Sequence, residues 1–184
     1  MDLDTIFKIL HIFGIALGAG GALISDAMFF SSVKDEKISQ TELRFLTIGS
    51  RAVWAGLAIL IISGLGMVWL DPANILSSEK FWAKMSIVGI ILINGIVFHI
   101  YHVPHLHRHV DIHFPSSLEF VRRIPLLLSS GVVSAISWPS ALILGALRRL
   151  PYSYVEIMST YFLILATVMF LTILFKKKII AHPR

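Results

Sequence analysis

Five apolar blocks, each long enough to cross a lipid bilayer, constrain this sequence more than any other feature. The blocks cover residues 6–30, 53–70, 81–103, 126–147 and 155–175. A bilayer core of about 30 Å requires about 20 apolar residues of helix, and backbone amides in lipid need hydrogen-bond partners within the spanning segment. The sequence therefore predicts an all-α fold, a polytopic membrane helix bundle of about five transmembrane helices, with residues 1–184 in a single integral membrane domain.

The composition excludes several other classes of protein. Hydrophobic residues make up 56% of the chain and charged residues only 15%, far from the balance of a soluble domain. The chain has no cysteine, which excludes thiolate-bound metal and iron–sulfur chemistry. The sequence also has no phosphate-binding loop, nucleophile–base pair or paired carboxylates, so hydrolysis and phosphoryl transfer are poorly supported.

The basic residues predict the orientation of the chain in the membrane. With the N-terminus outside, the inner segments contain 11 basic residues: Lys34, Lys37, Arg44, Arg51, Arg108, Arg122, Arg123, Lys176, Lys177, Lys178 and Arg184. The outer segments contain five: Lys8, Lys80, Lys84, Arg148 and Arg149. The positive-inside rule then predicts a multi-pass cell-membrane protein with its N-terminus outside and its C-terminus in the cytoplasm. The net charge of +5 fits this topology and attraction to anionic lipid, so the expected partner is the lipid bilayer and not nucleic acid.

A histidine and a series of small residues share one face of the first apolar block. At about 100° per residue, His11, Gly14 and Gly18 align, and Gly21 and Ser25 continue the same face. A histidine followed by a glycine groove is suited to a flat group such as porphyrin, with the ring lying against the backbone. The pattern Gly14-x-x-x-Gly18 is also a common close-packing surface between transmembrane helices, which would make His11 a buried, hydrogen-bonded histidine. The sequence leaves both interpretations open.

Lys84, near the start of the third block, belongs to the same outer half of the membrane as His11. A charged group within a spanning helix is costly unless it is paired or used, which makes this lysine a candidate functional residue. Together, His11 and Lys84 could hold a propionate or supply an axial ligand. The alternative for Lys84 is that its side chain extends to the outer headgroups.

Histidines gather at the end of the third block and just beyond it. His99, His102 and His105 form a candidate metal site, because neutral imidazole is a common metal ligand and the i, i+3 spacing of a helix brings such side chains together. The alternative is a partly solvated segment at the membrane interface, since a histidine-rich tract is only a compositional indication. Asp26 lies on the same side of the membrane, where His99, His102 or Arg51 could pair with it.

Two of these features resemble a known group of proteins. His11 with its glycine-rich continuation, and Trp82-Ala83-Lys84-Met85 at the start of the third block, resemble small multi-pass membrane proteins of the copper-resistance D superfamily, which includes the HemJ-type protoporphyrinogen oxidases. The resemblance covers about residues 3–105. In the HemJ type, a first-helix histidine is implicated in b-type haem ligation and a lysine that opens a later helix is essential. The resemblance implies these roles for His11 and Lys84.

Three functions follow from this reading of the sequence. The first is a redox or electron-transfer protein that binds haem b through His11, with the glycine face of Gly14 and Gly18 admitting the ring and a redox partner in the membrane. The second is a protein that transports or senses copper or another divalent metal through the inner histidines. The third is a membrane assembly subunit without a cofactor.

Overall fold

The chain folds into a bundle of long helices, as its apolar blocks predict. The computed structural model describes residues 1–184 except 35–36, 109, 112–117, 148–149 and 181–184. The long helices are α1 (Leu3–Lys34), α2 (Gln40–Leu70), α4 (Glu79–Val97), α6 (Leu118–Ala146) and α7 (Tyr154–Ile180). The short ones are α3 (Pro72–Leu76) and α5 (Val103–Arg108), the latter preceded by a π-helical turn, η1 (Phe98–His102).

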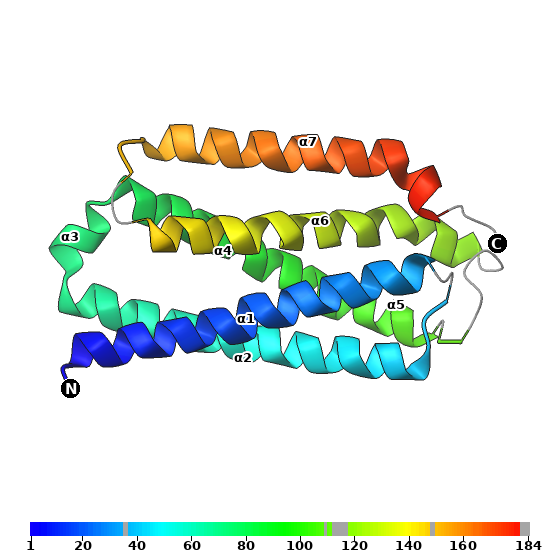
Figure 1. Cartoon of the computed structure of the whole chain (residues 1–184), viewed down its shortest axis with the longest axis horizontal. Helices are drawn as coiled ribbons and strands as arrows, with labels where there is room; N and C mark the ends of the chain where they lie inside the picture. The colour runs from blue at the N-terminus through cyan, green and yellow to red at the C-terminus, as the bar shows by residue number, and fades with distance from the viewer. Residues whose placement is uncertain (35–36, 109, 112–117, 148–149, 181–184) are drawn as a thin grey trace.

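Among the described residues, five helical segments are long and apolar enough to cross a membrane. Figure 1 shows the long helices lying lengthwise beside one another, with the start of α1 and the end of α7 at opposite ends of the bundle. The predicted all-α bundle of an integral membrane protein is thereby confirmed. Which end faces the cytoplasm stays a prediction.

α2 begins at Gln40, well before the start at Val53 that hydropathy predicts. Its first turn is closed by a capping box: the Ser39 hydroxyl accepts the Glu42 N–H at 3.2 Å, and the Glu42 carboxylate accepts the Ser39 N–H at 2.8 Å. The exposed Arg44 and Arg51 lie on this first part of the helix and lower its hydropathy. Hydropathy marks the part of a helix that suits lipid, whereas the capping residues mark where the helix begins.

α1 and α2 run antiparallel and share the most extensive helix contact in the described structure. A Cβ atom added at Gly56 would lie 2.6 Å from the Gly18 Cα and 2.7 Å from the Gly14 carbonyl oxygen. A Cβ atom at Gly21 would lie 3.1 Å from the carbonyl oxygen of Gly49. The two backbones therefore approach as closely as only glycine allows, which is how small residues join helices where lipid offers no hydrophobic driving force.

The residues of α1 at this contact alternate in steps of four and three, at positions 7, 11, 14, 18, 21 and 25. Their partners run the opposite way along α2: Phe7 contacts Gly66, His11 bonds Ser63, and Ser25 lies against Gly49. A repeat of 3.5 residues is the pattern of a left-handed helix pair. The face that the sequence assigned either to porphyrin or to helix packing is occupied by α2.

α4, α6 and α7 complete the bundle. α6 packs on both α1 and α4, and α7 packs on the outer side of α6 and α4 (Figure 1). Trp138 of α6 lies against α1, because a Cβ atom at Gly18 would come within 2.5 Å of its ring. The Ser137 hydroxyl is hydrogen-bonded to the Tyr161 hydroxyl at 2.8 Å, which ties α6 to α7.

The closest backbone approach gives a first prediction. Gly56→Ala should lower the free energy of unfolding by about 1–3 kcal/mol, because the new methyl group would overlap the backbone of Gly18. Gly20→Ala is the matched control: a Cβ atom there meets nothing within 4 Å, so better helix propensity should make it neutral or stabilising by up to about 1 kcal/mol. Unfolding by sodium dodecyl sulfate, followed by circular dichroism in micelles, measures both. Equal stability of the two variants would contradict the contact.

Candidate functional site

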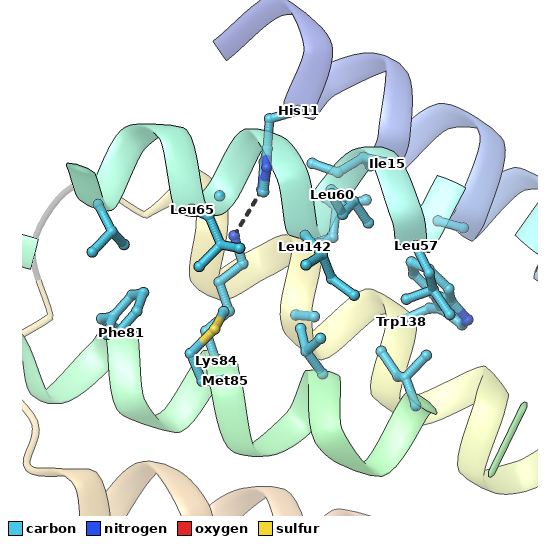
Figure 2. A pocket seen from close by; sticks show the side chains of 17 residues that line it. His11, Ile15, Leu57, Leu60, Leu65, Phe81, Lys84, Met85, Trp138 and Leu142 are labelled. Atoms are coloured by element: carbon cyan, nitrogen blue, oxygen red, sulfur yellow. Dashed lines mark hydrogen bonds between the residues drawn. The ribbon is translucent and has the colours of Figure 1, made fainter. Parts of the chain in front are cut away.

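The α1–α2 contact places the His11 imidazole between two polar groups from different helices. Its Nδ1 lies 2.9 Å from the Ser63 hydroxyl of α2, and its Nε2 lies 3.1 Å from the Lys84 ammonium of α4. His11 and Lys84 are separated by 73 positions in the sequence, and the structure brings them into direct contact, whereas the sequence predicted only that they share one half of the membrane. Figure 2 shows the two side chains pointing toward each other from α1 and α4.

The hydrogen bonds of Ser63 assign the tautomer of His11. The Ser63 hydroxyl donates its single hydrogen to the Ile59 carbonyl oxygen at 2.6 Å, so its oxygen is left to accept the Nδ1–H of His11. The hydrogen on Nδ1 leaves a lone pair on Nε2, where Lys84 donates. Metal-binding histidines share this arrangement, in which a neighbour accepts the Nδ1–H and Nε2 carries no proton.

A largely apolar cavity of about 150 Å³ extends from this pair into the bundle. α1, α2, α4 and α6 all contribute to its wall, and the apolar side chains labelled in Figure 2 are Ile15, Leu57, Leu60, Leu65, Phe81, Met85, Trp138 and Leu142. Of the described residues that line it, only His11 and Lys84 carry an ionisable side chain. The cavity therefore has one polar end and an apolar body, the usual form of a site for an amphipathic small molecule.

A second cavity, of about 290 Å³, adjoins the first at His11 and Lys84 and reaches the α3 end of the bundle. Its wall is more polar and includes Asn74, Ser78 and Lys80. Two glycines keep space open beside the pair. A Cβ atom at Gly64 would lie 3.9 Å from the His11 ring, and one at Gly145 would lie 3.6 Å from the Lys84 nitrogen.

Lys84 has no carboxylate partner in the described part of the chain. The ion pair found there joins Lys8 to Asp4 and does not involve Lys84. Its ammonium group lies within a predicted membrane span, half-buried and bonded to an imidazole instead of to an acid. A cation in such a place costs free energy unless a counter-charge reaches it. An acidic group on a ligand would supply that charge.

Gly14 and Gly18 do not line either of these two cavities. Gly14 faces Leu60 and Gly56, while Gly18 faces Gly56 and the Trp138 ring. Both glycines thus serve the contact between helices, which is the packing alternative. The residues of α1 that line the apolar cavity lie beside them and are His11, Ile15 and Ala19. For His11 and Lys84, binding of a cofactor stays a prediction.

The three inner histidines do not share one environment. His99 is exposed and lies edge-on to Trp54, with ring centroids 6.5 Å apart, whereas His102 and His105 are buried. The π-helical turn η1 widens the helix at this point and alters the i, i+3 alignment that the sequence predicts. Within the described ranges, no three His, Asp or Glu side chains form a group that could hold a metal ion. The metal site stays a prediction, and the further histidines at 109 and 113 lie outside the described residues.

Sequence reasoning missed Ser63 and the two flanking glycines, Gly64 and Gly145. Serine and glycine are ordinary in transmembrane helices, so neither type stands out in an apolar block. The antiparallel register of α1 on α2 identifies Ser63 as the partner of His11, and the glycine repeat that sets this register is visible in the sequence.

Comparisons with family models, with curated proteins and with solved structures find no match to this chain.

The assigned tautomer gives a second prediction. In ¹⁵N nuclear magnetic resonance spectra of histidine-labelled protein, His11 should show a protonated Nδ1 and an unprotonated Nε2, because Ser63 accepts and Lys84 donates. The signal is identified by its loss in His11→Gln. Ser63→Ala should mix the two tautomers and cost about 0.6 kcal/mol, the average for a hydrogen bond between membrane helices. Ser159→Ala, at an exposed position of α7, should change neither the tautomer of His11 nor the stability of the protein. A proton on Nε2 in the wild type would contradict the assignment.

Proposed function

We propose that this membrane protein binds b-type haem at the paired cavities, where His11 would hold the iron and Lys84 would pair with a haem propionate. The proposal rests above all on one observation: a histidine with an unprotonated Nε2 and a lysine without a carboxylate partner in the described residues meet at the polar end of an apolar cavity. Haem b carries the three matching features, namely an iron that binds imidazole, acidic propionates and a flat apolar ring.

The space beside the pair favours a ligand that fills both cavities. Small-molecule sites typically enclose about 300–1,000 Å³, more than the apolar cavity of about 150 Å³ provides alone. The adjoining cavity of about 290 Å³ brings the available space into that range, and its polar wall places Lys80 near Lys84. The apolar cavity suits the ring, and the polar cavity suits the propionates.

Each residue of the site then has a defined role. Ser63 holds His11 with Nε2 toward the cavity, and Lys84, which contacts Nε2, would pair with an acidic group of the haem instead. The apolar wall excludes water, which strengthens the charge contact between Lys84 and a carboxylate. Met85 lines both cavities and Met67 lines the polar one, so their thioethers would be further groups able to hold the iron. When bound, haem would supply one-electron redox chemistry.

The main alternative is a bundle without a cofactor, in which the His11–Lys84 hydrogen bond serves only to join α1 and α4. The two functions differ in what His11→Ala removes. If the protein binds haem, His11→Ala loses the imidazole that would hold the iron, and the visible absorption of haem is lost with it. For a purely structural role, it loses one interhelical hydrogen bond, worth about 0.6 kcal/mol on average.

The absorption spectrum gives the third prediction. Purified wild-type protein, as isolated or after addition of haemin, should show a Soret band and sharp α and β bands on reduction. His11→Ala should abolish these bands. Lys84→Met should weaken haem affinity by about 10- to 100-fold, the equivalent of losing a hydrogen bond to a charged group. Gly64→Leu should also reduce binding, because its side chain would enter the space beside His11.

Two control variants separate these effects from general damage to the fold. Gly20→Leu places the same bulk at a position of α1 where a Cβ atom meets nothing within 4 Å, and His99→Ala removes an exposed histidine outside both cavities. Both should bind haem as the wild type does. A folded wild-type protein that takes up no haem, or a His11→Ala variant that binds it normally, would refute the proposal.

A further inference from the structure

A separate polar cavity of about 60 Å³ lies deeper along α1, around Asp26. Residues of four helices line it, and those with polar side chains are Ser25, Asp26, Ser50, Trp54, Asn94, Ser130, Ser134 and Trp138. Ile91 and Trp138 line both this cavity and the one beside His11, so they separate the two. The cavity around Asp26 is therefore a second site, independent of the proposed haem site.

The Asp26 carboxyl has unsatisfied hydrogen-bonding capacity. Its Oδ2 and the Ser25 hydroxyl oxygen are both buried and have no hydrogen-bond partner in the described structure. Ser134 is the hydrogen-bonding neighbour of the carboxyl. Asn94 is already engaged, because its side chain accepts from the Ser130 hydroxyl at 2.8 Å and donates to the Ser130 carbonyl oxygen at 3.1 Å. The Asn94–Ser130 hydrogen bonds join α4 to α6. They leave the Oδ2 of Asp26 facing the cavity without a partner among the described residues.

Among the residues that the structure describes, no cationic side chain pairs with Asp26. The described lining of the cavity contains no lysine, arginine or histidine from α1, α2, α4 or α6, and Asp26 forms no ion pair among the residues that the structure describes. The sequence suggested three partners for Asp26: Arg51 and His99 are exposed, and His102 does not line this cavity. Asp26 lies within the span that ends at Ser32, where an unpaired carboxylate is costly. Its negative charge has to be removed by a proton or balanced by a cation from outside the protein.

We propose that Asp26 is a reversible proton-binding site served by water in this cavity. A water molecule needs at least about 10–15 Å³ and two to four polar partners, and a cavity of about 60 Å³ with serine hydroxyls meets both conditions. A hard metal ion takes about six or more oxygen ligands, whereas the unpartnered oxygens here are those of Asp26 and Ser25. A proton needs only one oxygen. Water in the cavity provides the donors and acceptors for its exchange.

Infrared difference spectroscopy tests this site without reference to haem. The wild-type protein, in lipid and without added sodium, should show the C=O stretch of a protonated carboxyl that disappears reversibly as the pH is raised. The band should be absent in Asp26→Asn, a nearly isosteric variant, and its frequency should shift in Ser25→Ala. Asp71→Asn, which changes an exposed aspartate after α2, should keep the band. Haem binding should be unchanged in Asp26→Asn, so that failure of one site is distinguishable from failure of the other.

Three results would overturn the proposal. The first is the absence of the band at every pH at which the protein stays folded, which would mean that Asp26 remains ionised. The second is a band that never titrates, which would mean that the carboxyl is a fixed hydrogen-bond donor. The third is loss of the band on addition of sodium at constant pH, with no such loss on addition of choline, which would identify the site as one for a metal cation.

Discussion

The backbone contact between α1 and α2 is the interaction on which the rest of this structure depends. In lipid, apolar side chains gain little by leaving the solvent for another helix, so helices associate through close packing and hydrogen bonds. Gly18 and Gly56 provide that packing, since a Cβ atom at Gly56 would lie within 2.6 Å of the Gly18 Cα. The close approach fixes the register of the two helices, and with it the residues of α2 that each side chain of α1 meets.

This register places the polar residues of α1 at sites where other helices can use them. His11 meets Ser63 near one end of the contact, and α4 brings Lys84 to its other nitrogen. Asp26 lies near the other end, in a cavity closed by α4 and α6. Trp138 of α6, which rests on Gly18, lines both cavities and divides them. α1 thus contributes to two chemically different sites in different halves of the bundle: its His11 pairs with Lys84 of α4, and its Asp26 lines the polar cavity.

The sequence predicts the fold well because the bilayer restricts the choice of structures. Long apolar blocks give the spans, and the spacing of His11, Gly14 and Gly18 gives a shared face that the structure confirms. The same spacing cannot decide what covers that face, because a porphyrin and a second helix both require small residues. The start of α2 was readable from Ser39 and Glu42, whose capping pattern hydropathy ignores. Ser63 and the π-helical turn at His99 depend on tertiary contacts and local backbone geometry, which periodicity does not specify.

Disulfide trapping tests the central contact most directly, because the chain has no cysteine of its own. A Cβ atom at Gly49 would lie 3.4 Å from the Ser25 Cβ, close to the distance of about 3.5–4.5 Å that a disulfide spans. The double variant Ser25→Cys with Gly49→Cys should therefore form an intramolecular disulfide under mild oxidation, detected by mass spectrometry as loss of both free thiols in the monomer. Gly20→Cys with Gly49→Cys should keep both thiols, because a Cβ atom at Gly20 meets nothing within 4 Å and so does not approach Gly49. Free thiols in both variants, or crosslinking only between copies, would contradict the register on which both sites depend.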